Sequence, residues 1–163
     1  MGKRLIVMRG VQGSGKTTFA KSAFKGAPRF SADDFFSWLS DKGTSRHDPR
    51  YLFDPAKLPE AHAVCLRNAT RALMSIFSER AVVIIDNTHT KVWQFAPYVA
   101  LGLAYDWDVR IVHMRVASAD LRACAERNVH NVPYESIRRA YESFERVPEE
   151  WRHLMYSPEE AVR

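Results

Sequence analysis

The sequence predicts an α/β fold in which helices flank a central parallel sheet, and three observations support this prediction. Short β-rich runs are almost continuously apolar at residues 5–8, 82–85 and 109–114, with Phe30-Ser31 as a weaker fourth strand candidate. Runs of this character are typical of strands buried on both faces. Helical patterns separate the runs, and strands that alternate with helices form parallel sheets. A glycine-rich loop joins the first run to the first helix.

The helical patterns follow in order along the chain. Apolar side chains recur at 3.6-residue spacing over residues 59–79, which predicts an amphipathic helix. Shorter helices are expected over residues 92–103 and 120–127. Pro133 is expected to open a last helix, because proline is favoured at the first helical position. The segment after Pro148 has no clear pattern.

The loop after the first strand matches the phosphate-binding pattern G-x-x-x-x-G-K-[ST]. Its glycines allow backbone N–H groups to approach phosphate oxygens closely. Lys16 adds a positive charge for the β and γ oxygens, Thr17 supplies a hydroxyl for Mg²⁺, and the following helix directs its positive end at the same anion. The sequence therefore predicts binding of ATP with Mg²⁺. The residues expected to hold the nucleotide are Gly10, Gly13, Ser14, Gly15, Lys16, Thr17 and Thr18.

Length and composition indicate one compact domain over residues 1–163. Of these residues 46% are hydrophobic, which is enough for one core. Cys65 and Cys124 lie far apart in helix-like segments, so we expect reduced, buried thiols. No run approaches the roughly 18 apolar residues that cross a bilayer, and the first strand begins almost at once, so we expect a cytoplasmic protein. The net charge of +5 suits nucleic acid as a partner, and it would also suit ATP alone.

A carboxylate and polar side chains follow the apolar run at 82–85. Asp86 is expected at the carboxyl edge of the sheet, where it would hold Mg²⁺ together with Thr17, partly through water. The alternative is an aspartate that forms a turn. Asn87 and Thr88 are expected to face the cleft and contact the substrate, or else to cap the next helix.

Two adjacent carboxylates follow the weaker strand candidate. Asp33 is expected to act as the general base that accepts the proton of an attacking hydroxyl group. Asp34 is expected to cap the following helix or to support the substrate side of the site. Capping alone would also explain both residues.

A mobile arginine commonly supplies positive charge over a transferring phosphoryl group. Arg127 is the candidate, because it precedes a short polar break at residues 128–133 that could serve as a hinge. Arg122 lies on a similar helical face and is a second candidate for contact with the nucleotide. For either arginine the alternative is a solvated surface ion pair.

The longest segment without periodicity runs from residue 41 to residue 59. A loop of that length in a compact domain is usually functional or disordered. Arg46 and Arg50 in this segment are expected to hold the backbone phosphates of a nucleic acid substrate. Phe36 and Trp38, near the proposed base, are the aromatic candidates for contact with the acceptor, and a place in the core is the alternative.

The motifs occur in a characteristic order: G-x-x-G-S-G-K-T-T, then Asp33-Asp34, then residues 85–88, then Arg127-Asn128, then Val132-Pro133 and an R-R-x-Y-E helix. This set resembles the 5′ polynucleotide kinase family, which includes the phage polynucleotide kinase domain and the kinase-like domain of Nedd4-binding proteins. The resemblance covers roughly residues 4 to 146. It implies a P-loop kinase with a central parallel sheet, flanking helices and a short helical lid. It also implies ATP and Mg²⁺, a base at Asp33 and a lid arginine at Arg127.

The departures from that family concern the acceptor. The phage enzyme has an arginine that clamps the substrate phosphate, and this chain has Phe36 in its place. No counterpart of the phage enzyme's second lid arginine is found. The leading hypothesis is transfer from ATP to a hydroxyl group on DNA or RNA, with a 5′-hydroxyl end as the default acceptor. The alternatives are a hydroxymethyl pyrimidine within DNA, as in phage base hypermodification, a small-molecule hydroxyl, and a nucleotide-controlled binding module without an acceptor.

Overall fold

The computed structural model describes residues 2–37, 53–76 and 78–163. Its described strands form one sheet in the order β2-β3-β1-β4-β5, and every neighbouring pair is parallel. The strands are β1 (Arg4–Arg9), β2 (Arg29–Phe30), β3 (Val82–Asp86), β4 (Asp108–His113) and β5 (Met155–Tyr156). The predicted parallel α/β sheet is therefore confirmed.

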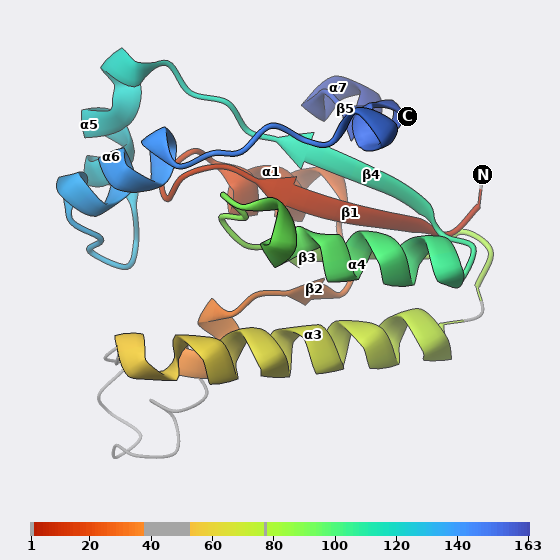
Figure 1. Cartoon of the computed structure of the whole chain (residues 1–163). Coiled ribbons are helices and arrows are strands. Elements are labelled where there is room, and N and C mark those ends of the chain that lie inside the picture. The colour runs from red at the N-terminus through yellow and green to blue at the C-terminus, as the bar shows by residue number, and fades with distance from the viewer. Residues whose placement is uncertain (1, 38–52, 77) are drawn as a thin grey trace.

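Helices cover both faces of this sheet, and a helical pair lies beyond the ends of the strands (Figure 1). Residues 33–37 are also helical. None of the described helices is both long enough and apolar enough to cross a membrane. The α-helices are α1 (Lys16–Ala23), α3 (Leu58–Ser75), α4 (Val92–Ala104), α5 (Leu121–Arg127), α6 (Tyr134–Glu142) and α7 (Pro158–Ala161), and the 3₁₀ helices are η1 (Pro55–Lys57), η2 (Ser118–Asp120) and η3 (Glu149–Leu154).

The core consists of two layers because successive residues of a strand point to opposite faces. Leu5 and Val7 of β1 pack in a cluster with residues of α3 and α4. Ile6 and Met8 pack on the other face in a cluster with residues of α1 and α7. All four side chains are fully buried, as expected for a parallel strand in the centre of a sheet. The continuous apolar run was therefore a reliable signal.

The strands and helices predicted from periodicity are present, with small differences at their ends. The weaker candidate strand is shifted by one residue and forms β2. The long helix α3 ends at Ser75 rather than at residue 79, because Ile76 has extended torsion angles that lead the chain back toward β3. Pro133 does cap a helix, but that helix is not the last one. Strand β5 and helix α7 follow it, and both are too short to show a periodic pattern.

The paired helices α5 and α6 occupy the end of the molecule toward which the strands point (Figure 1). We call residues 118–142 the lid segment. Its apolar side chains form a separate small cluster in which Leu121, Cys124 and Ile137 pack together with Val11 of the loop after β1. The lid segment is therefore anchored on the loop that the sequence predicts to bind phosphate.

Arg9, the last residue of β1, joins three parts of the chain. Its Nε donates to the carbonyl of His89 at 2.9 Å, and its guanidinium also donates to the carbonyls of Thr90 and Glu145. The guanidinium lies 4.7 Å from the ring centroid of Phe95, an arrangement that favours a cation. Although Arg9 is only 1% exposed, its charge is compensated by carbonyl oxygens and a ring face.

Replacing Arg9 with Met should lower the free energy of unfolding by about 3 kcal/mol or more, because buried carbonyl groups would lose their donor. Urea unfolding measures the change. Arg67→Met is the matched control, since Arg67 is exposed on α3, and its effect should stay within about 0.5 kcal/mol. Equal stability of the two variants would contradict a structural role for Arg9.

Candidate functional site

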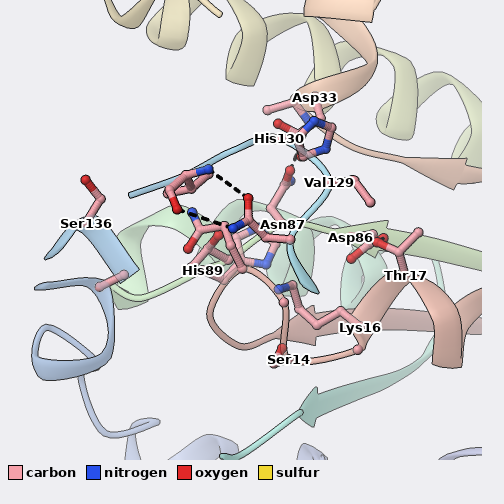
Figure 2. A pocket seen from close by; sticks show the side chains of 18 of the residues that line it. Ser14, Lys16, Thr17, Asp33, Asp86, Asn87, His89, Val129, His130 and Ser136 are labelled. Atoms are coloured by element: carbon pink, nitrogen blue, oxygen red, sulfur yellow. Dashed lines mark hydrogen bonds and ion pairs between the residues drawn. The ribbon is translucent and has the colours of Figure 1, made fainter. Parts of the chain in front are cut away.

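A cleft of about 970 Å³ lies at the carboxyl ends of β1 and β3 (Figure 2). Its walls come from the loop between β1 and α1 together with α1, the turn that carries Asp33, Phe53 with the start of α3, the residues after β3 with Gln94 of α4, and the lid segment. Ligands of open α/β sheets bind at this edge, beyond the carboxyl ends of the strands. The cleft therefore has the position that the phosphate-binding pattern predicts.

The phosphate loop has a backbone that only glycine allows at two of its positions. Gly10 has a φ of +146°, and a Cβ there would lie 2.8 Å from the carbonyl oxygen of Met114. Gly13 has a φ of +73°, and a Cβ there would overlap the carbonyl of Cys124 in α5. The loop thus packs directly against the lid segment. Ser14, Gly15, Thr17 and Thr18 line the cleft with Gly13, and the Ser14 Oγ is buried without a partner among the described residues.

Lys16, the first residue of α1, points back over the loop. Its Nζ donates to the carbonyls of Gly10 and Val11, both at 2.7 Å. Burial lowers the pKa of the Lys16 ammonium to about 8, and the nearby Asp86 and Asp33 carboxylates oppose this effect. Because Lys16 is buried and its ammonium group is held by loop carbonyls, it would gain from an anion in the cleft.

Thr17 and Asp86 lie side by side in the cleft, as Figure 2 shows. The Thr17 hydroxyl donates to Oδ2 of Asp86 at 2.6 Å, and Arg29 approaches the same oxygen at 3.4 Å. Oδ1 of Asp86 is buried without a partner among the described residues. A hydroxyl and a free carboxylate oxygen are ligands that Mg²⁺ prefers.

Thr17 and Asp86 would suit a cation that is held mainly by the phosphates of a bound nucleotide. Within residues 2–37, 53–76 and 78–163, no group of three or more His, Cys, Asp and Glu side chains could hold a metal ion. Mg²⁺ commonly binds through one or two carboxylates together with substrate phosphates and water. Thr17 and Asp86 therefore fit the Mg²⁺ site predicted from the sequence, and their binding of the ion stays a prediction.

The turn before helical residues 33–37 is held by a capping box. The Ser31 hydroxyl accepts from the Asp33 N–H at 3.2 Å, and the Asp34 carboxylate accepts from the Ser31 N–H at 2.9 Å. Asp34 also pairs with Arg29 at 2.8 Å. Among the described residues that line the cleft, Asp33 is present and Asp34 is not. The structure therefore gives Asp34 the capping role and does not support the predicted contact with substrate. The S-x-x-D spacing was the signal for this cap.

Asn87 and Thr88 line the cleft, and both also connect elements around it. The side-chain oxygen of Asn87 accepts from the Ala32 N–H at 2.8 Å, which fixes the turn that carries Asp33. The Thr88 carbonyl accepts from the Gly10 N–H at 3.1 Å. The segment after β3 thus positions both the phosphate loop and the proposed base.

Phe36 requires a correction. It is fully buried and packs against Phe35, with ring centroids 5.4 Å apart. Phe36 therefore belongs to a small core with Ala32, Phe35 and Ala61, and it is not among the described residues that line the cleft. Phe53, which contacts Phe36, is half-exposed and lines the cleft, and sequence reasoning did not identify it.

Three other predicted substrate residues lie outside the described residues: Trp38, Arg46 and Arg50.

The two lid arginines differ in position. Arg127 lines the cleft, and its Nε donates to the carbonyl of Gly13 at 3.0 Å. Arg122 lies over the Tyr134 ring, 4.9 Å from the centroid, and is not among the described residues that line the cleft. The predicted nucleotide contact of Arg122 is therefore not supported. The helix face of Arg122 points toward α6, and this direction is set by packing within the lid segment.

Histidines that received no role in the sequence analysis also border the cleft. His130 lies in the linker between α5 and α6, and its Nε2 is 3.7 Å from Oδ2 of Asp33. His62 of α3 lines the same wall, and burial lowers its pKa. No sequence spacing links either histidine to Asp33, because the contacts arise only from the folded arrangement.

His89 is held in an unusual conformation beneath the cleft. Its φ of +50° lies in the left-handed region, and its Nδ1 donates to the carbonyl of Met8 at 2.9 Å. Burial lowers the pKa of His89 to about 3, so the ring is neutral at physiological pH. His113 at the end of β4 packs 4.8 Å from the Phe144 ring, and burial lowers its pKa to about 4.

Comparison with known proteins identifies the family. The family model described as AAA domain matches residues 5–147. The chain is similar to NEDD4-binding protein 2 of Homo sapiens, at 31% identity over 153 residues, which cover 90% of this chain. The same alignment covers only 8% of that much longer protein.

Solved structures show the same fold. A gluconokinase from Sinorhizobium meliloti 1021 is 18% identical, with a TM-score of 0.58 over 98% of this chain and 89% of that chain. Chaetomium thermophilum Kti12 in complex with ADP-AlF3 is 13% identical, with a TM-score of 0.63 over 94% of this chain and 87% of that chain. The fold is therefore that of a P-loop kinase.

Acid should destabilise the protein between about pH 6.5 and pH 4. Imidazoles in an unfolded chain titrate near pH 6.5, and His89 and His113 in the folded chain titrate near 3 and 4. In this range the unfolded chain binds more protons, so the free energy of unfolding falls as the pH falls. Each histidine contributes a slope of up to about 1.4 kcal/mol per pH unit. Urea unfolding across the range measures the slope, and His113→Phe should reduce it. A pH-independent free energy would contradict the neutral, buried state.

Proposed function

The chain belongs to the family described as AAA domain. We propose that it is an ATP-dependent kinase that transfers the γ-phosphoryl group to a hydroxyl group on nucleic acid. A polynucleotide 5′-hydroxyl is the leading candidate for the acceptor. The observation that carries this proposal is the position of Asp33, a half-exposed carboxylate that lines the same cleft as the phosphate loop. A nucleotide-controlled switch needs no acceptor base, whereas a kinase does.

The donor side of the cleft would hold ATP through the phosphate loop. Loop N–H groups and the end of α1 would bind the phosphates, with Lys16 near the β and γ oxygens. Thr17 and Asp86 would hold Mg²⁺, which neutralises charge that develops on the phosphates when it is bound. Arg127 stands beside Gly13 and would add positive charge from the lid segment.

The acceptor side of the cleft is the wall formed by Asp33 and its neighbours. Asp33 would accept the proton of the attacking hydroxyl group, whose oxygen forms the new bond to the γ-phosphorus while the bond from that phosphorus to the β–γ bridging oxygen breaks and ADP leaves. The capping box and Asn87 hold the turn beneath Asp33, so the carboxylate is presented from a fixed backbone. Positioning of this kind accounts for much of the rate of phosphoryl transfer.

Two features support nucleic acid as the acceptor. The ordered motifs resemble the 5′ polynucleotide kinase family, and the chain carries a net charge of +5, which favours polyanionic partners. A hydroxymethyl pyrimidine within DNA is a second candidate. It is favoured by the half-exposed Phe53 ring on the acceptor wall, because aromatic rings stack on unpaired bases.

The acceptor should be revealed by transfer of label from γ-labelled ATP to oligonucleotides. A free 5′-hydroxyl oligonucleotide should be labelled, and an oligonucleotide with blocked ends should not. Label only on a blocked oligonucleotide with hydroxymethyl pyrimidines would instead support the second candidate. Label on none of them, together with label on a sugar or nucleoside, would contradict a nucleic acid acceptor.

Lys16→Ala and Asp33→Asn should both abolish transfer, but for different reasons. Loss of Lys16 should weaken ATP binding and transfer, because the phosphates lose a buried cation. Asp33→Asn should lower transfer about 1,000-fold and change the dissociation constant of ATP less than about twofold. Asp106→Asn is the matched control, since Asp106 is exposed and its φ of +57° suits asparagine. If Asp33→Asn lost ATP binding, the base assignment would be wrong.

A further inference from the structure

One contact joins the lid segment to the acceptor wall of the cleft. His130 Nε2 lies 3.7 Å from Asp33 Oδ2, and the two side chains are 30% and 51% exposed. Figure 2 shows them beside each other on the side of the cleft opposite Lys16. The residues belong to distant parts of the chain, so the contact holds the linker between α5 and α6 against the turn that carries the proposed base.

The linker, residues 128–133, has a defined internal structure. The Asn128 side-chain oxygen accepts from the Val132 N–H at 2.7 Å, and its amide donates to the carbonyls of Ala125 and Val132. These bonds close the linker into a compact loop directly after α5. The linker that contains His130 is therefore joined directly to the end of α5 that carries Arg127.

Arg127 completes the connection to the phosphate loop. Its guanidinium donates to the carbonyl of Gly13 at 3.0 Å and to Sγ of Cys124 at 3.3 Å. The linker therefore contacts the acceptor wall through His130. The adjoining end of α5 contacts the phosphate loop through Arg127. The two contacts are three residues apart in the sequence.

Other charged groups face Asp33 from different elements. Lys16 of α1 and His62 of α3 both interact electrostatically with the Asp33 carboxylate. Burial lowers the pKa of His62, so its ring is neutral. Neither group belongs to the lid segment. Of Lys16, His62 and His130, His130 is the one that belongs to the lid segment. Its contact with Asp33 therefore also positions that segment.

We propose that His130 is a positioning residue for phosphoryl transfer: its contact with Asp33 seats the linker, and thereby holds Arg127 over the phosphate loop. The inference rests on the proposed function, since it takes Asp33 as the base and Arg127 as the lid arginine. It assigns a role to a residue whose position in the sequence suggested none. His130 acts through Arg127 and Asp33, and the acceptor hydroxyl would enter beside it.

Hydrogen exchange of the free protein tests the contact without any substrate. His130→Leu and Asp33→Ala should each increase amide exchange about tenfold in residues 129–132, and the double variant should match the single ones. His130→Gln keeps a donor and should exchange like the wild type. His153→Leu is the matched control because His153 is exposed on η3, and it should change nothing in the linker. Unchanged exchange in either His130→Leu or Asp33→Ala would overturn the proposal.

Steady-state kinetics test whether the contact serves transfer. With the acceptor that the wild type labels, His130→Leu should lower kcat about tenfold and leave the KM for ATP within about twofold. His130→Gln should restore kcat to within about twofold of the wild type. A wild-type kcat in His130→Leu would overturn the role in transfer. If the wild type labelled no acceptor, the proposed function would fail, and the exchange result would still decide whether His130 seats the linker.

Discussion

The parallel register of β1 and β3 is the constraint on which the rest of the site depends. It places Met8 opposite Asp86, so both strands end at the same height and their following loops start side by side. The bonds that connect these two strand ends and their loops include Gly10 N–H to the Thr88 carbonyl, Arg9 to the His89 carbonyl, and the Thr17 hydroxyl to Asp86. A shift of one residue would turn alternate side chains to the wrong face and separate the hydroxyl from the carboxylate.

Buried polar groups around this edge are energetically expensive, and their arrangement indicates a ligand. Arg9 is compensated by carbonyls of three other residues, as a structural cation must be. Lys16 instead donates hydrogen bonds to carbonyls of its own loop. Asp86 has one buried oxygen without a partner among the described residues. Incomplete satisfaction of polar atoms is costly in a core. At the phosphate loop it leaves a buried lysine and a buried carboxylate oxygen at the cleft, where the proposed nucleotide and Mg²⁺ would bind.

The sequence predicts the parts of the molecule whose signals are local. Apolar runs gave the central strands, and the glycine spacing gave the phosphate loop, because both patterns follow from backbone geometry. Strand β5 has only two residues, so its pairing with β4 depends on tertiary packing. Phe36 and Arg122 are close in the sequence to predicted site residues. Whether their side chains point into the cleft depends on which face of the helix packs against the core. The contact of His130 with Asp33 joins distant segments, and no periodicity in one sequence reveals it.

The lid segment contains a packed pair of helices and a more exposed linker. Its helices share a small core with Val11 of the phosphate loop, and a Cβ at Gly13 would overlap Cys124, so the base of the lid is packed on the donor side. The linker contacts that core through Val132, whereas Val129, just before His130, is 83% exposed. Residues 129–131 of the linker are therefore not part of that core, whereas movement of α5 would disrupt packing around the loop. Because Arg127 is at the junction of these two parts, its placement depends on the packed helix behind it and on the seated linker ahead of it.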